Sequence, residues 1–201
     1  DLVMEVDALA ELVRFARATP AAGLIGPAIE GVSGGHQHAD ALPTPSGILR
    51  EAMGLSTARR REIVPGSSPF ETNWICGAAM LAPADLIREV GGFDRRFFLY
   101  FEETDLCVRL ARPGRQLWSF PKATSRQFGG ASARKVQPDL PEWGCLVEHY
   151  YPSRFYYLIK HHGIGYALAV EVGEYAMLLL RDFARLAKLR ASPARIATRL
   201  R

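Results

Sequence analysis

Three carboxylates stand within four positions of the chain, directly behind a run of aromatic residues. The carboxylates are Glu102, Glu103 and Asp105, and the aromatic run covers residues 97–101. Apolar surroundings can raise the pKa of a carboxylate until it is useful as a base near neutral pH. This order of residue types predicts the edge of an active site.

The aromatic run is expected to hold the acidic cluster in place. Burial of residues such as Phe98 and Phe101 stabilises a fold by about 1.5–3 kcal/mol each, so the charges that follow are fixed in position. Residues 105–110 look helical, with Asp105 near the positive helix end and Arg109 one turn later. We expect the cluster at a loop-to-helix junction. An acidic helix start with a surface Asp105–Arg109 ion pair is the alternative.

Composition indicates a folded chain with patchy basic charge. The chain has 201 residues, of which 48% are hydrophobic and 23% charged, enough for one substantial domain and an appendage. The net charge of +4 comes mostly from residues 59–61 and the C-terminal third, which fits phosphate, anionic lipid or a solvated surface. Cys76, Cys107 and Cys145 lack metal-ligand or disulfide spacing, which fits a reducing cytosol.

Alternating helix and strand patterns favour an α/β fold. Helices are expected at 6–18, 83–90 and 105–110, and strands at 23–27, 74–81 and 116–120, with 74–81 as a central strand. The stretch 31–69 looks like a long loop with a helical piece around 48–61.

The C-terminal third is expected to be helical. The segment 141–162 is rich in aromatic residues, and 164–189 forms a second helix that carries too many charges to span a bilayer. Its basic end could lie on an anionic membrane face. A helical hairpin that packs on its own domain or on a partner subunit is the alternative.

Three blocks of the sequence resemble the second half of family 2 glycosyltransferases, most closely the rhamnosyltransferase type that builds bacterial cell-surface polysaccharide. The blocks are Trp74–Leu81 (WICGAAML), Val90–Asp94 (VGGFD) and Phe98–Arg109 (FLYFEETDLCVR). The resemblance covers roughly residues 1–132 and, weakly, 151–163. It implies a partial GT-A domain, a Rossmann-like α/β sheet, over 1–138. The residue pattern described above predicts a helical extension over 139–201 that could associate with a membrane.

The resemblance also implies roles for single residues. Glu103 corresponds to the catalytic base, with Glu102 beside it and Asp105 as a helix-start or acceptor-orienting group. Residues implied to bind substrate are Gly77, Ala78, Ala79, Asp94 and Arg109. Asp1 matches the last carboxylate of an Asp-x-Asp-like metal motif, so a divalent ion, Mg²⁺ or Mn²⁺, is the implied cofactor.

The sequence departs from the family pattern at three points. The family more often has Asp where Glu103 stands, so this base would reach one methylene further. A histidine of the family, often a metal ligand, corresponds to Gln127. The nucleotide-binding half of the family lies before Asp1, and the chain is therefore expected to be a fragment.

The resemblance thus implies an inverting glycosyltransferase. It would move a rhamnose-like hexose from a nucleotide-diphosphate sugar to a lipid-linked or cell-surface glycan, in the cytoplasm or on the inner face of the plasma membrane. No nucleic-acid partner is expected. The alternative is a truncated, non-catalytic remnant that acts as a binding or scaffold piece.

Overall fold

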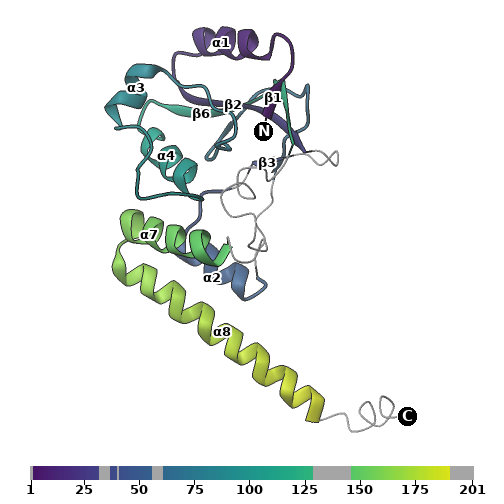
Figure 1. The fold of residues 1–201 in the computed structure, drawn as a ribbon, viewed down its shortest axis with the longest axis vertical. Coiled ribbons are helices and arrows are strands. Elements are labelled where there is room, and N and C mark those ends of the chain that lie inside the picture. The colour runs from purple at the N-terminus through teal and green to yellow at the C-terminus, as the bar shows by residue number, and fades with distance from the viewer. Residues whose placement is uncertain (1, 32–36, 40, 56–60, 129–145, 191–201) are drawn as a thin grey trace, which may run out of the picture. The chain divides into compact units, whose positions relative to one another are not determined.

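The computed structural model describes residues 2–31, 37–39, 41–55, 61–128 and 146–190 (Figure 1). The chain divides into two compact units, which are described separately. The first comprises residues 1–42 and 58–157, and the second residues 43–57 and 158–201. The proposed domain boundary at 138/139 lies outside the described residues and stays a prediction.

A mixed β-sheet forms the framework of the first unit. Strands β2 (Ala22–Gly31) and β6 (Gln116–Gln127) run parallel, while β1 (Leu2–Met4) and β5 (Phe70–Thr72) pair with β6 in antiparallel register. The sheet order is β1-β6-β2, with β5 also on β6. A separate ladder joins β3 (His38–Ala39) to β4 (Arg61–Glu62).

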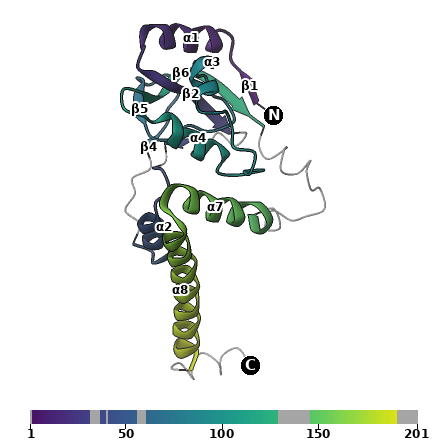
Figure 2. The same ribbon diagram turned by 90° about the vertical axis from the view of Figure 1, so that its left-hand side faces the viewer.

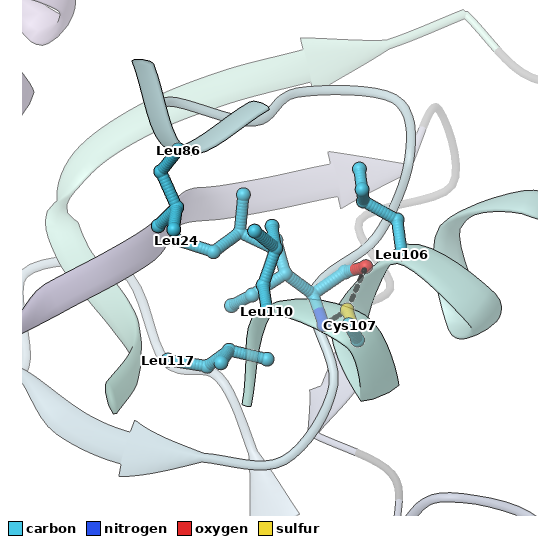
Figure 3. Packing of buried hydrophobic residues seen from close by; sticks show 7 residues of the cluster. Leu24, Leu86, Leu106, Cys107, Leu110 and Leu117 are labelled. Carbon is cyan, nitrogen blue, oxygen red and sulfur yellow. Dashed lines mark hydrogen bonds between the residues drawn. The ribbon is translucent and has the colours of Figure 1, made fainter. Parts of the chain in front are cut away.

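Helices cover both faces of this sheet because successive strand residues point to opposite sides. Helix α1 (Ala8–Ala18) packs on the face that carries Ile25, through Ala8 and Leu12. Helices α3 (Ala84–Glu89) and α4 (Glu102–Leu110) pack on the face of Leu24 (Figures 1 and 3). The fold is therefore α/β, a partial Rossmann-like sheet followed by C-terminal helices, as predicted from the sequence.

Most of the expected elements form, and several are longer than predicted. The strands expected at 23–27 and 116–120 are β2 and β6, each extended at its C-terminal end. The helices expected at 6–18, 83–90 and 105–110 are α1, α3 and α4. The helix α4 begins three residues earlier than predicted, so the acidic residues form its first turn.

The central strand predicted for Trp74–Leu81 is wrong. This segment is irregular, and Leu81 alone bridges to the sheet, opposite Ile25. A turn over Gly77–Ala79 interrupts the extended backbone, and the Ile75 amide bonds to a side chain of α4 instead of a strand. Apolar content identified a buried segment but could not distinguish a strand from an irregular one.

Two further predictions need correction. Phe98 is not interior, because it is 67% exposed, whereas its neighbour Phe97 and the more distant Phe101 are buried. The helical piece expected at 48–61 is shorter and earlier: α2 spans Pro45–Ala52, and Arg61 begins β4. Thr44 caps α2 by accepting a hydrogen bond from the Gly47 amide, and Pro45 suits the first helical turn.

The described part of the C-terminal segment is helical, as predicted, and residues 141–145 of the prediction lie outside it. A π-helical turn, η1 (Leu146–Tyr150), leads into α7 (Tyr151–His162), and α8 (Ile164–Arg190) follows. The first unit contains α7 as far as Tyr157. In the second unit α2 lies against α8 (Figure 2). Of the helices described here, none is both long enough and apolar enough to cross a bilayer.

Candidate active site at the start of helix α4

The chain enters α4 through two consecutive residues in the left-handed backbone region. Tyr100 has φ 66° and Phe101 has φ 68°, a conformation that is uncommon for residues other than glycine. Such residues persist only where surrounding contacts hold them, and they are frequent at active sites. The turn places Glu102 and Glu103 in the first turn of α4, at the loop-to-helix junction expected from the sequence.

Aromatic rings from η1 and α7 hold this turn. The Phe101 ring lies 5.3 Å from both the Tyr150 ring and the Tyr157 ring, and Tyr100 meets Tyr150 edge to face at 5.7 Å. Aromatic pairs at these separations add about 0.5–1.5 kcal/mol beyond their buried area. Sequence reasoning missed this support, although the density of tyrosine residues in 150–157 was a usable signal.

Glu103 has the most perturbed carboxylate of the described chain. Its pKa is raised to about 7, mainly by burial and then by the adjacent Glu102 charge, while backbone amides at the helix start oppose the shift. Its Oε2 atom is buried and accepts no hydrogen bond from the residues that the structure describes. A carboxyl group of this kind can be deprotonated near neutral pH while one oxygen remains available for a proton.

Glu102 shares the environment of Glu103. Burial raises the pKa of Glu102 as well, and its Oε2 atom likewise has no hydrogen-bond partner among the described residues. Two adjacent carboxylates of this kind share a poorly hydrated space, so ionisation of one disfavours ionisation of the other.

The glycine-alanine turn of the irregular segment lies against Glu103. A Cβ atom at Gly77 would be 3.2 Å from Glu103 Cβ, closer than most real contacts. The structure therefore brings together two of the predicted site residues, 26 positions apart. Ala78 is exposed in the same turn, and Ala79 is half-buried.

Three hydrogen bonds clamp this segment to α4. The Trp74 indole N–H donates to Thr104 Oγ1 at 3.1 Å. The Cys107 thiol accepts from the Ile75 amide at 3.3 Å and donates to the Ile75 carbonyl at 3.7 Å, within the apolar cluster of α3 and α4 (Figure 3). Burial raises the pKa of Cys107 to about 12, so it acts as a packed hydrogen-bonding group.

Asp105 forms a buried ion pair one turn along the helix. Its Oδ2 accepts hydrogen bonds from Arg109 Nε at 2.8 Å and pairs with Arg109 Nη2 at 2.7 Å, and the Asp105 side chain is fully buried. Arg109 also donates to the Val90 carbonyl at 2.8 Å. The predicted pair exists but is not a surface pair, and it joins α4 to the end of α3.

Asp94 lies in a separate polar cluster at the aromatic run. Its carboxylate accepts hydrogen bonds from Arg96, through the backbone amide and the guanidinium at 3.1–3.2 Å, and from the Tyr156 hydroxyl at 3.0 Å. The Arg96 guanidinium also stacks on the Tyr156 ring at 4.5 Å. Tyr156 of α7 therefore contacts a residue that the sequence assigned to substrate binding, a link that sequence reasoning did not find.

A small pocket opens beside the clamped segment. Burial raises the pKa of the Cys76 thiol in its wall, and the buried Ser119 hydroxyl has no hydrogen-bond partner among the described residues. The residues that line the pocket are Gly26, Pro27, Ile29, Gln37, Ile63, Trp74, Ile75, Cys76, Ala79 and Ser119.

The described residues do not supply a metal site. Asp1, to which the sequence analysis assigned an ion, lies outside them. Within the described ranges there is no group of three or more His, Cys, Asp or Glu side chains that could hold an ion. A divalent metal therefore stays a proposal, and no chemical step below depends on one.

Comparisons with known proteins point to glycosyl transfer. No family model matches the chain. Over 106 residues it is 33% identical to an N-acetylglucosaminyl-diphospho-decaprenol L-rhamnosyltransferase of Mycobacterium tuberculosis, found in strains CDC 1551 / Oshkosh and ATCC 25618 / H37Rv. The match covers 47% of this chain and 34% of the relative, so the chain spans about a third of the length of the curated relatives it matches. This similarity supports a relationship to glycosyltransferases.

Proposed function

We propose that this chain contributes the acceptor-activating side of an inverting glycosyltransferase of the family 2, GT-A type. The reaction moves a rhamnose-like hexose from a nucleotide-diphosphate sugar to a lipid-linked glycan. The observation that carries the proposal is the Glu103 carboxyl group at the start of α4, which has a pKa of about 7 and a buried oxygen that accepts no hydrogen bond from the described residues. The similarity to a rhamnosyltransferase supports the choice of reaction.

In the proposed step Glu103 acts as a general base. One carboxylate oxygen takes the proton of the acceptor hydroxyl while the hydroxyl oxygen bonds to the anomeric carbon of the donor sugar. The bond from that carbon to the nucleotide diphosphate breaks on the opposite side, so the configuration inverts. A base whose pKa lies near the working pH combines a useful ionised fraction with a strong pull on the proton.

The neighbouring residues prepare Glu103 for this task. The Glu102 charge keeps the pKa of Glu103 high. Asp105 acts as a positioning residue, because its buried pair with Arg109 fixes α4 against the end of α3. Gly77 leaves room beside the carboxylate, so Gly77 and the adjacent Ala78 and Ala79 form the proposed floor of the acceptor site.

The donor side of the proposal rests on the resemblance alone. A divalent metal ion would neutralise charge on the departing diphosphate when bound. Peripheral contact with a membrane is part of the proposal, because the acceptor of the relative is linked to a lipid.

A sugar-transfer assay tests the assignment of the base. The donor is a nucleotide-diphosphate L-rhamnose, and the acceptor is a polyprenyl-diphospho-N-acetylglucosamine. Glu103→Gln should lower kcat by about 10²–10⁴-fold, the usual contribution of a general base. Glu103→Asp should keep part of the activity, and the exposed Glu71→Gln on β5 serves as control.

The pH profile provides an independent readout. Because the base must be deprotonated, kcat/KM should rise with pH and level off above about 7, where Glu103 is ionised. The proposal would be contradicted if Glu103→Gln kept full activity, or if kcat/KM did not change with pH around 7. A non-catalytic scaffold is not favoured, because a purely structural helix start has no need of a buried carboxylate whose oxygen lacks a hydrogen-bond partner among the described residues.

A further inference from the structure

Helix α8 presents a continuous apolar stripe that no described residue of the second unit covers. Its members follow one another at spacings of three or four residues, which keeps them on one helical face. Each is between 51% and 68% exposed: Ile164, Leu168, Val172, Tyr175, Leu179 and Phe183. The stripe is about 29 Å long at 1.5 Å per residue.

The other side of α8 is the side that packs within its own unit. Ala167 and Val170 are fully buried, and a Cβ atom at Gly173 would lie 2.5 Å from Leu49 of α2. These three positions fall outside the stripe on a helical projection, so α2 occupies a different face (Figure 2). An exposed apolar face of this extent marks a surface that meets a membrane or another molecule.

The charge of the sequence distinguishes a membrane from a second copy of the chain as the partner of the stripe. From Ile164 onward the chain has seven basic residues, Arg181, Arg185, Lys188, Arg190, Arg195, Arg199 and Arg201, against three acidic residues, Glu171, Glu174 and Asp182. A second copy of the chain would bring the same excess of positive charge to the contact. An anionic lipid surface attracts it, by about 1 kcal/mol for each basic residue held near the headgroups.

We propose that α8 lies in the plane of an anionic membrane, with the stripe from Ile164 to Phe183 inserted among the lipid chains. An amphipathic helix with aromatic and leucine residues on one face and basic residues beside it binds membranes in this way. The inference rests on the proposed function and deepens its membrane contact, because it names the helix face of the second unit that would bring the chain to a lipid-linked substrate.

Two adjacent leucines provide a matched test. Leu179 and Leu180 are both 61% exposed on the same helix, but Leu179 lies in the middle of the stripe and Leu180 is turned about 100° away from it. Leu179→Gln and Leu180→Gln therefore make the same substitution at neighbouring positions, with the same effect on helix propensity. Circular dichroism should show that both full-chain variants keep their helix content.

The measurement is co-sedimentation of the full chain with phosphatidylcholine vesicles, with and without phosphatidylglycerol, and with no sugar donor or acceptor present. The wild type should bind the anionic vesicles and lose most of this binding at high salt. Leu179→Gln should reduce partitioning by about tenfold, and Leu180→Gln by less than about twofold, because only Leu179 loses a lipid contact.

Three results would overturn the proposal. The first is that the wild type does not bind anionic vesicles, and the second is that both variants lose vesicle binding equally. The third is a dimer in solution that Leu179→Gln dissociates, which would assign the stripe to a second copy. Because neither donor nor acceptor is present, failure here is distinguishable from failure of the transfer reaction.

Discussion

Replacement of Glu103 by glutamine is expected to stabilise the fold, and only at higher pH. The folded pKa of about 7 lies above the ordinary 4.5. Between these values the folded chain holds a proton that the unfolded chain has released, so the free energy of unfolding falls as pH rises. The loss is about 1.4 kcal/mol per pH unit and reaches ~3 kcal/mol over the interval, an upper limit for a partly solvated group.

Glutamine resembles the protonated carboxyl group and does not ionise. Glu103→Gln should therefore match the wild type at about pH 4 and exceed its free energy of unfolding by up to ~3 kcal/mol at about pH 8. Urea unfolding followed by far-ultraviolet circular dichroism across this range measures the difference. The stability is thus fully present below the unfolded pKa and is lost as pH rises through the folded pKa.

Glu102→Gln is the matched control, because it removes the same charge from the same helix turn. Burial alone raises the pKa of Glu102, whereas the pKa of Glu103 is also raised by the neighbouring charge. We therefore expect a smaller gain in the free energy of unfolding for Glu102→Gln, in the same direction. A difference between Glu103→Gln and wild type that stays constant from acid to alkaline pH would refute the reasoning, since the carboxyl group would then not be desolvated.

Three further outcomes test the structure around the site. Gly26→Ala should lower the free energy of unfolding by about 1–3 kcal/mol, because its Cβ would lie 2.5 Å from Ile75 Cγ2; an Ile75→Ala background should remove most of this cost in urea unfolding. Asp105→Asn should lower the free energy of unfolding by about 3–5 kcal/mol, because it leaves Arg109 poorly paired. The double variant Asp105→Leu/Arg109→Met should recover much of this loss, and strictly additive losses would contradict a coupled pair. Cys107, with its pKa of about 12, should resist iodoacetamide until the chain unfolds, and labelling of the folded chain seen by peptide mass spectrometry would contradict its burial.

Local sequence signals predicted the elements around the site but not the contacts between them. Pro83 precedes the start of α3 and Gly91 follows its end, and the acidic residues mark the start of α4. The juxtaposition of Gly77 with Glu103 was anticipated only through the resemblance to a family. No spacing rule connects residues 26 positions apart when one of them lies in irregular backbone.

The errors have identifiable physical causes. The segment at Ile75 reads as a strand because it is apolar, yet its backbone amide is satisfied by the Cys107 side chain, a pairing that no local pattern encodes. Phe98 reads as buried because apolar residues favour the interior, but its neighbour Phe97 takes the interior position. In both cases tertiary contacts decide among locally equivalent options.

The strained turn, the buried carboxyl group and the aromatic helix form one energetic unit. Left-handed conformations at Tyr100 and Phe101 cost about 1–3 kcal/mol each, and desolvation of Glu103 adds a further cost above its unfolded pKa. These terms disfavour the site, so it persists only because packing outweighs them. The rings of Tyr150 and Tyr157 supply that packing directly on the strained residues. The aromatic segment assigned from the sequence to a separate extension is, on this argument, partly a structural component of the site, and its loss would relax the turn and return Glu103 to water.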